Sequence, residues 1–261
     1  MKKLKWISLF LVFTLFLAAC GNSESETSDE GSGSSGENTV YKVGIDTTYP
    51  PFEFEENGEY TGIDIDLITA IAEKQGFEIE FSPMDFGGII PAMQAGQLDV
   101  AIAGMSITDD RKKVVDFSDP YFDAGLSLVV QEGNTDIESA DDLKGKKVAV
   151  KKGTTGATYA TENTEKLGIE VVQFNDSPAM FQEVANGNAD VLIEDYPVIA
   201  YAIAQKDLGL KIVGDRLNGD QYGIAVLKGE NTELLEKINT GLAEMKEDGS
   251  YDEIINKYLG E

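Results

Sequence analysis

The sequence predicts two α/β lobes joined by a two-strand hinge, and two observations support this. Beyond residue 40, short apolar runs typical of strands alternate with helical patterns, as when the run VYKVGI is followed by the stretch DIDLITAIAEKQG. Such alternation favours α/β architecture with a largely parallel sheet. The second observation is that a similar series of strands and helices returns after residue 145. We therefore expect two lobes of similar construction.

The internal repeat aligns at two places. AGQLDVAIAGMS (95–106) and NGNADVLIEDYP (186–197) share the same order of features. In both, a glycine closes a predicted helix, an aspartate follows, and a predicted buried strand comes next. The first strands match as well, with KVGIDTTY (42–49) against KVAVKKGT (147–154).

The end of the chain predicts a return to the first lobe. QYGIAVLKG and a helix-rich tail follow the second series of elements. We expect lobe 1 to comprise residues 41–121 and 223–261, and lobe 2 to comprise residues 127–217. The connections at 122–126 and 218–222 would form the hinge, because two crossings between rigid bodies define an axis of rotation.

The alignment places polar residues at facing strand ends. Asp46 falls opposite Lys151, and Gly104 falls opposite Asp195. Ligands of open α/β sheets bind beyond the carboxyl ends of the strands. The sequence therefore predicts a cleft between the lobes that contains these four residues.

Composition excludes several classes of function. The 261 residues are 42% hydrophobic, which is enough for two cores, and 21 basic against 47 acidic residues give a net charge of −26. This charge argues against nucleic acid as a partner. The absence of histidine excludes an imidazole base and histidine-ligated zinc. KKGTTGATY lacks the spacing of a phosphate-binding loop, which makes nucleotide binding a weak prediction. We expect no cofactor and no metal.

The N-terminus predicts export and a lipid anchor. Lysines precede an apolar run that is too short to span a bilayer comfortably, so residues 1–19 are expected to be a signal peptide. Leu-Ala-Ala-Cys-Gly then resembles a bacterial lipoprotein cleavage box, in which Cys20 would receive the lipid. Residues 20–39 contain mainly serine, glycine and acidic side chains, which predicts a disordered tether.

Side chains near the predicted cleft suit a zwitterion. Ser106 and Arg111 bring a hydroxyl and a guanidinium, and Thr155 opens a predicted helix whose free N–H groups accept anions. These three residues would take an α-carboxylate. Asp195 and the carbonyl of Gly104 would take an α-ammonium. Free α-amino acids fit this set of groups.

Several of these residues have a plainer interpretation. Asp46 can cap a turn, and Thr108 can cap a short helix that leaves Arg111 in solvent. Glu194 and Asp195 are neighbours at a strand end, where one of the two is expected to face a ligand. The residues alone leave these alternatives open.

A series of motifs carries a family resemblance. VGIDTTYPPFEF, TGIDIDLITAIA, PMDFGGIIPAMQAGQLDVAIAGMSITDDRKKVVDFSDPYF, VAVKKGTTG, ADVLIEDYP and GDRLNGDQYGIAV occur in this order between about residues 41 and 260. Together they resemble the substrate-binding proteins of bacterial ABC importers for polar amino acids, and glutamine-binding proteins most. The resemblance implies the type II periplasmic-binding-protein fold and ligand binding by hinge closure, without catalysis.

The resemblance also implies roles for individual residues. Tyr49 and Phe86 would sandwich the ligand, and Asp46 and Lys151 would bond its side-chain amide. The main-chain end of the ligand would contact Gly104, Ser106, Arg111, Thr155 and Asp195.

Three positions depart from the glutamine-binding pattern. Tyr49 replaces phenylalanine and Thr155 replaces glycine, which keeps the ring and the backbone N–H. Glu194 replaces histidine and adds negative charge.

The side-chain partners favour glutamine. A neutral amide needs one donor and one acceptor, whereas glutamate would set its carboxylate against Asp46 and arginine its guanidinium against Lys151. If Glu194 reached the side-chain pocket, it would pair with Lys151 and leave Asp46 to attract a cation. Arginine or another basic amino acid is therefore the alternative ligand.

The expected partners follow from this interpretation. They are a free amino acid, the membrane permease subunits of an importer and, through Cys20, the extracellular face of a Gram-positive cell membrane. We expect a monomer. A rival hypothesis is an enzyme, since the scaffold also resembles dehydratases of the cyclohexadienyl type and Glu194 near Lys151 would serve as a general acid. Nothing else in the sequence demands turnover.

Overall fold

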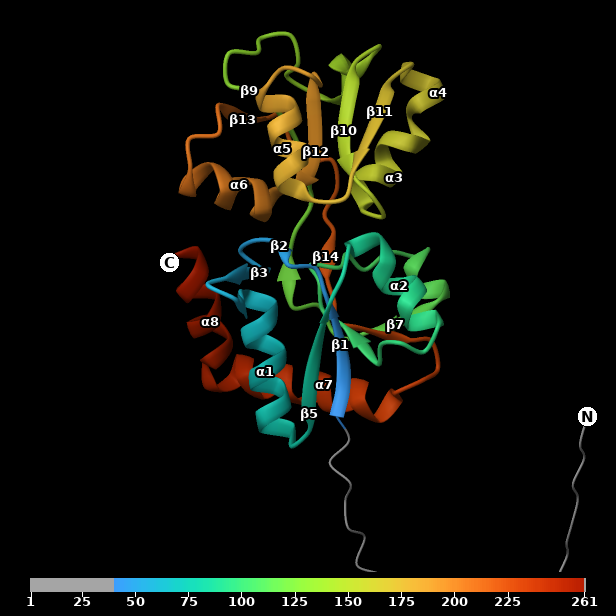
Figure 1. Ribbon diagram of the computed structural model, residues 1–261, viewed down its shortest axis with the longest axis vertical. Coiled ribbons are helices and arrows are strands. Elements are labelled where there is room, and N and C mark those ends of the chain that lie inside the picture. The colour runs from blue at the N-terminus through green and yellow to red at the C-terminus, as the bar shows by residue number, and fades with distance from the viewer. Residues whose placement is uncertain (1–39, 261) are drawn as a thin grey trace, which may run out of the picture. The chain divides into compact units, whose positions relative to one another are not determined.

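The computed structural model describes residues 40–260, which form two α/β lobes (Figure 1). The predicted signal peptide (1–19) and the predicted tether with Cys20 (20–39) lie outside the described residues. No helix within residues 40–260 is both long enough and apolar enough to cross a membrane.

Lobe 1 contains a five-stranded sheet in the order β5-β1-β6-β15-β7. These strands are β1 (Val40–Ile45), β5 (Glu78–Pro83), β6 (Val100–Ala101), β7 (Val115–Phe117) and β15 (Ala225–Leu227). Its helices are α1 (Ile63–Gln75), α2 (Phe86–Gln94), α7 (Thr232–Asp248) and α8 (Ser250–Leu259), with a 3-10 turn at Arg111–Lys113. A small sheet of β2 (Thr48–Tyr49), β3 (Glu53–Glu56) and β4 (Glu59–Thr61) follows β1.

Lobe 2 repeats this plan with the strand order β11-β10-β12-β9-β13. Its strands are β9 (Leu126–Gln131), β10 (Lys147–Lys151), β11 (Glu170–Phe174), β12 (Val191–Asp195) and β13 (Leu210–Val213). Its helices are α3 (Thr155–Glu162), α4 (Thr164–Leu167), α5 (Ser177–Ala185) and α6 (Tyr196–Gln205), with a 3-10 turn at Ala140–Leu143.

Both sheets are mixed. β1 is parallel to β5 and β6, and β10 is parallel to β11 and β12, as the alternating pattern predicts. The expectation of largely parallel sheets is nevertheless too simple, because β15 and β9 each run antiparallel to both of their neighbours. The predicted two-lobed α/β class is confirmed.

The antiparallel strands β9 and β15 directly follow the two segments by which the chain crosses between the lobes. β8 (Phe122–Asp123) pairs with β14 (Gln221–Tyr222) between the lobes (Figure 1). β8 leads into β9 of lobe 2, and β14 leads into β15 of lobe 1. Each crossing segment therefore continues directly into the sheet of the lobe that it joins, which anchors the connection at both ends.

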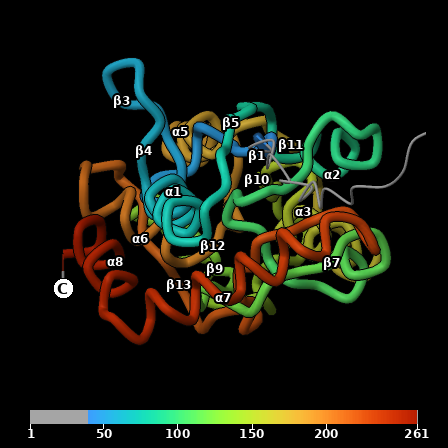
Figure 2. Tube along the Cα trace, turned by 90° about the horizontal axis from the view of Figure 1, so that it is seen from below, coloured from blue at the N-terminus to red at the C-terminus, as the bar shows by residue number. Residues whose placement is uncertain are grey.

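Helix α1 shows how the sequence sets the local structure. Ile63, Leu67 and Ile71 recur every four residues and are fully buried, so they form one apolar face. The helix ends at Gly76, whose φ of 68° is the left-handed conformation that glycine adopts without a side-chain clash. The buried face of α1 packs on α7, which crosses the underside of lobe 1 (Figure 2).

A buried pair of carboxyl groups supports the cleft side of lobe 1. Asp64 Oδ2 accepts hydrogen bonds from Gly104 N at 2.8 Å and Tyr121 Oη at 3.0 Å. Glu53 is fully buried, and no N–H or O–H group of the described residues donates to its carboxyl. Asp64 Oδ1 likewise receives no donor from the described residues, so a proton shared between the Glu53 and Asp64 carboxyls would supply the missing hydrogen bond.

Burial is the main reason why both carboxyls hold protons more strongly than usual. It raises the pKa of Glu53 well above its ordinary value, and the Asp64 charge raises it further. Burial also raises the pKa of Asp64 to about 6, against the lowering effect of its hydrogen bonds. Folded protein thus binds more protons than unfolded chain above the ordinary carboxyl range, so this pair makes the free energy of unfolding fall as pH rises.

We predict that Glu53→Gln reduces this pH dependence to the part that Asp64 contributes, because an uncharged amide keeps a donor for Asp64 at every pH. Wild-type protein should lose stability relative to the variant between about pH 5 and pH 8, by at most about 1.4 kcal/mol per pH unit for one proton. Urea unfolding followed by circular dichroism at several pH values measures this. Glu55→Gln, at an exposed position on the same strand, is the control. Parallel stability curves for wild type and Glu53→Gln would contradict the shared proton.

Candidate ligand-binding site

A small pocket lies between the strand ends of the two lobes. It is lined by Tyr49, Phe86, Gly104, Ser106, Arg111, Lys151, Thr154, Thr155 and Asp195. Eight of the ten predicted site residues are in this set, and the other two, Asp46 and Glu194, are buried and bonded to members of it. The pocket volume is about 10 Å³, which is room for about one water molecule. A larger ligand can therefore enter only if the lobes move apart.

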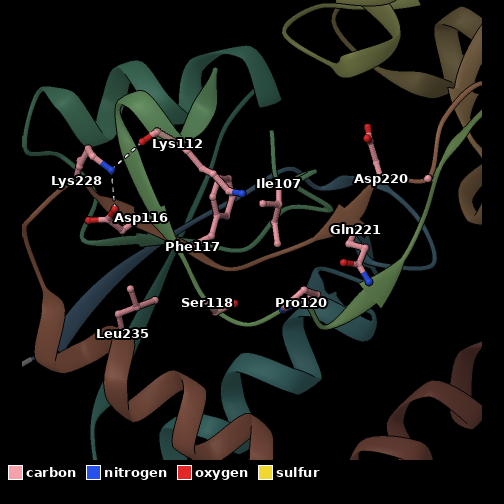
Figure 3. A pocket seen from close by; sticks show the side chains of 11 residues that line it. Ile107, Lys112, Asp116, Phe117, Ser118, Pro120, Asp220, Gln221, Lys228 and Leu235 are labelled. Carbon is pink, nitrogen blue, oxygen red and sulfur yellow. Dashed lines mark hydrogen bonds and ion pairs between the residues drawn. The ribbon is translucent and has the colours of Figure 1, made fainter. Parts of the chain in front are cut away.

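A larger hollow lies on lobe 1 beside the hinge, outside the cleft (Figure 3). Its volume is about 720 Å³, and its lining includes the apolar side chains of Ile107, Phe117 and Leu235. Lys228 Nζ bonds Lys112 O at 2.8 Å and Asp116 Oδ1 at 2.9 Å. Lys228 and Asp116 pair with each other and both side chains are partly exposed, unlike the buried charges of the cleft, so we place the candidate site in the cleft.

Asp46 and Lys151 meet across the cleft, as the internal repeat predicts. Asp46 directly follows β1 of lobe 1, and Lys151 ends β10 of lobe 2. Lys151 Nζ lies 2.5 Å from Asp46 Oδ2, and both side chains are at most 3% exposed. Asp46 Oδ1 accepts from Thr48 N and Oγ1, so the turn-capping interpretation of Asp46 holds as well.

The two predicted aromatic walls contact the Lys151 ammonium. Lys151 Nζ lies 4.5 Å from the centre of the Tyr49 ring and 5.9 Å from that of Phe86. Such cation–π contacts are worth more when the cation is desolvated. The space between the two rings therefore accommodates a cationic or polar group.

Arg111 lies in the cleft and not in solvent. Its Nη1 donates to Ser106 O at 2.8 Å within lobe 1, and its Nη2 donates to Gly153 O of lobe 2 at 3.0 Å. Thr108 Oγ1 accepts from Arg111 N at 3.2 Å, so Thr108 does cap this turn as the alternative interpretation holds. No carboxylate of the described residues forms an ion pair with Arg111, and burial lowers its pKa.

The two acidic residues at the end of β12 occupy different positions. Asp195 lines the pocket, and its Oδ2 accepts from Tyr49 Oη at 2.7 Å and Tyr222 Oη at 2.6 Å. Glu194 lies behind it, where it accepts from Ser177 Oγ at 2.5 Å and from Asp195 N at 2.9 Å. No basic side chain of the described residues forms an ion pair with Asp195, and none of them donates to its Oδ1.

Backbone groups complete the pocket. Gly104 has a φ of +52°, and a Cβ there would lie 2.6 Å from the Tyr49 ring, so only glycine lets the ring pack on this strand end. Thr155 is the first residue of α3, and Thr154 Oγ1 caps this helix by accepting from Ala157 N at 3.2 Å. The remaining free N–H groups at this helix end suit an anion.

The sequence did not point to Tyr222, Ser177 or Thr154. Tyr222 belongs to the crossing strand β14, which has no counterpart in the internal repeat. Ser177 opens α5 and reaches Glu194 only in the folded lobe. Thr154 directly precedes Thr155, the predicted start of a helix, which is a weak indication that Thr154 belongs to the site.

The pocket thus has two charges of opposite sign, Arg111 and Asp195, that form no ion pair with any of the described residues. A half-buried guanidinium beside a helix N-terminus can take a carboxylate, while the Asp195 carboxylate, which lines the pocket together with Gly104, can take an ammonium. Within residues 40–260, no cluster of three or more cysteine or acidic side chains could hold a metal ion.

Comparison with known sequences gives a family for this chain. Residues 41–261 match the family of bacterial extracellular solute-binding proteins, family 3. The ABC transporter glutamine-binding protein of Bacillus subtilis is 34% identical over 274 residues, covering 100% of this chain and 98% of the relative. The arginine-binding extracellular protein of Bacillus subtilis is 33% identical over 258 residues, covering 98% of each chain.

Solved structures show the same fold. An ancestral arginine-binding protein bound to arginine is 51% identical with a TM-score of 0.79, covering 84% of this chain and 97% of that one. The structure of an ancestral arginine-binding protein bound to glutamine is also 51% identical, with a TM-score of 0.78, and covers 85% and 98%. An ancestral amino acid-binding protein, a precursor of cyclohexadienyl dehydratase, is 43% identical with a TM-score of 0.76, covering 84% and 95%.

Proposed function

Because the chain belongs to family 3 of the bacterial extracellular solute-binding proteins, we propose that it is the amino-acid-binding component of an ABC importer and that glutamine is its preferred ligand. The observation that carries the proposal is the pair of unpaired charges in the cleft, Arg111 and Asp195. A free α-amino acid is the small molecule that carries the complementary carboxylate and ammonium a short distance apart.

The α-carboxylate would lie at the Arg111 end. The guanidinium bonds Ser106 O and Gly153 O and keeps further donors for an anion. Thr155, at the start of α3, adds free backbone N–H groups from lobe 2. The ligand would therefore contact both lobes through one functional group.

The α-ammonium would lie at the Asp195 end, where Oδ1 receives no donor from the described residues. The carbonyl of Gly104 supplies a second acceptor from lobe 1. Tyr49 and Tyr222 bond the other carboxylate oxygen and hold its orientation.

The ligand side chain would reach the Asp46–Lys151 pair between the aromatic rings. An amide donates to Asp46 and accepts from Lys151 at once, so it can insert into the pair without leaving either charge unsatisfied. Glutamate would leave Asp46 facing a second carboxylate, and the resulting unpaired charge would weaken its binding. This chemistry supports glutamine.

Arginine is the second candidate, and the charge balance of the cleft favours it. The three carboxylates Asp46, Glu194 and Asp195 face two cations, Lys151 and Arg111. If all five are charged the cleft has one negative charge in excess, which a cationic side chain would neutralise. An ancestral protein 51% identical to this chain has been solved with arginine bound.

Binding would proceed by closure about the β8–β14 pair. We propose lobe 1 at 41–121 and 223–261, lobe 2 at 127–217, and hinge segments at 122–126 and 218–222. The contacts that bridge the lobes then favour the closed form, and a ligand that bonds both lobes shifts the equilibrium toward it.

The cellular setting is proposed from the sequence. Cys20 would be lipidated after removal of residues 1–19, and residues 20–39 would tether the protein at the extracellular face of the membrane of a Gram-positive cell. There the monomer would deliver its ligand to the permease subunits of the importer.

The enzyme hypothesis ranks below transport. Glu194, its proposed general acid, is behind Asp195 and does not line the pocket. Incubation with prephenate or arogenate followed by product analysis tests it directly, and we expect no turnover.

We predict that calorimetric titration at neutral pH finds glutamine binding more tightly than arginine, histidine or glutamate. Asp46→Ala and Lys151→Ala should change this order, because they remove the acceptor and the donor for the side chain. Tight arginine binding together with none for glutamine would contradict the lead assignment.

Replacing Arg111 should weaken every amino acid alike. We expect Arg111→Ala to raise the Kd of each bound amino acid by about 10- to 150-fold, from the roughly 1.5–3 kcal/mol of a charge-assisted hydrogen bond. Lys112→Ala, at the next and exposed position, is the matched control. Unchanged binding by Arg111→Ala would refute the α-carboxylate assignment.

Closure can be tested at two glycines with nearly the same backbone conformation. Gly153 and Gly145 have φ values of +76° and +71°, but a Cβ at Gly153 would lie 2.8 Å from Gly87 Cα of the other lobe, whereas one at Gly145 would meet nothing within 4 Å. Both alanine variants should lose about 1–2 kcal/mol of folding stability. Only Gly153→Ala should also weaken ligand binding, by about tenfold or more. Equal affinities in the two variants would show that this contact does not form on binding.

A further inference from the structure

A cluster of hydroxyl and carboxyl groups lies behind the pocket, and its distances constrain where protons lie. Tyr49 Oη is 2.7 Å from Asp195 Oδ2 and 3.1 Å from Glu194 Oε1. Tyr222 Oη is 2.6 Å from the same Asp195 oxygen and 3.5 Å from Tyr49 Oη. Ser177 Oγ is 2.5 Å from Glu194 Oε2.

Counting protons in this cluster leaves one contact without a donor. Tyr49 has one hydroxyl proton, which it can donate either to Asp195 at 2.7 Å or to Glu194 at 3.1 Å, and the shorter contact favours donation to Asp195. Tyr222 donates its own proton to Asp195 as well. The contact between Glu194 Oε1 and Tyr49 Oη then joins two oxygens, and it is a hydrogen bond if Glu194 is protonated and donates to Tyr49.

The surroundings of Glu194 favour its neutral form. Its side chain is buried on β12. The charged or titratable groups that face it are Asp195 on the same strand and Lys151 on β10. Tyr49 of lobe 1 and Tyr222 of the crossing strand β14 also face it. Burial first, and the Asp195 charge second, raise the pKa of Glu194 to about 7, against the lowering effects of Lys151 and Ser177. Glu194 is therefore poised between its two charge states at neutral pH.

The charge of Glu194 decides the balance of the cleft. With Glu194 neutral, the carboxylates of Asp46 and Asp195 balance the cations of Lys151 and Arg111, which suits an amino acid with a neutral side chain. With Glu194 ionised the cleft has one negative charge in excess. Lys151 would then be stabilised by Glu194 from within lobe 2, leaving the Asp46 carboxylate to receive a cationic side chain.

We propose that Glu194 is a protonation-dependent specificity residue, which keeps its proton when a neutral amino acid such as glutamine binds and releases it to solvent when a cationic amino acid such as arginine binds. This rests on the proposed function and adds to it a means by which one cleft accepts both ligand classes. No bond other than the Glu194 O–H bond is broken, and the proton passes to the buffer.

Proton exchange on binding tests the proposal. Titrations at pH 7 in buffers with different heats of ionisation should show about half a proton taken up with glutamine and about half a proton released with arginine, because free Glu194 is about half protonated there. The ratio of arginine to glutamine affinity should rise by up to about tenfold per pH unit between pH 6 and pH 8.

Two variants locate the proton. Glu194→Gln should exchange no proton with either ligand and should show a ratio of affinities that does not change with pH. Ser177→Ala removes a hydrogen-bond donor to the ionised Glu194 carboxylate, which raises the pKa of Glu194. The change of each ligand's affinity with pH should therefore occur at higher pH and keep its slope.

Opposite results are equally clear. Wild-type protein that binds glutamine or arginine without proton exchange, or a Glu194→Gln variant that keeps the wild-type pH slope, would overturn the proposal while leaving amino-acid binding intact. Each ligand is a test by itself, so binding of only one still decides the question. Failure of wild-type protein to bind any amino acid would instead overturn the proposed function, and this inference with it.

Discussion

The constraint on which the rest of this structure depends is that a buried charge needs a partner. Arg111 and Asp195 face the same small pocket, and neither forms an ion pair with any of the described residues. Removing a charge from water without a partner costs several kcal/mol. We therefore propose that lobe closure and ligand binding are coupled, because a zwitterion can supply both missing partners as the lobes exclude water.

The fold brings these charges together through repetition. Both sheets point their strand ends at the cleft, so that β1 delivers Asp46 opposite Lys151 of β10 at 2.5 Å. The crossing strands β8 and β14 each continue into a strand of the lobe they enter. In the proposed hinge, motion about that pair would separate or join the two halves of the site while leaving each sheet intact.

The sequence predicts those contacts of the site that follow from strand patterns and from the internal repeat. The internal repeat predicts that Asp46 lies opposite Lys151, since equivalent strand ends meet at equivalent positions. It could not predict Tyr222, because a crossing strand has no counterpart in the repeat and its hydroxyl meets Asp195 only after folding. The carboxyl pair beneath Gly104 was missed for the same reason, since its members become neighbours only when β3 packs against α1.

Glu194 lies behind the pocket, and we propose that it affects ligand choice only through Tyr49, Lys151 and Asp195. The proposed function places a zwitterion between Arg111 and Asp195. The most direct test is a crystal structure with L-glutamine bound. Our account predicts the α-carboxylate within about 2.7–3.2 Å of the Arg111 guanidinium and the α-ammonium at the same range from Asp195. Glutamine bound in the reverse orientation, or outside the cleft, would contradict it.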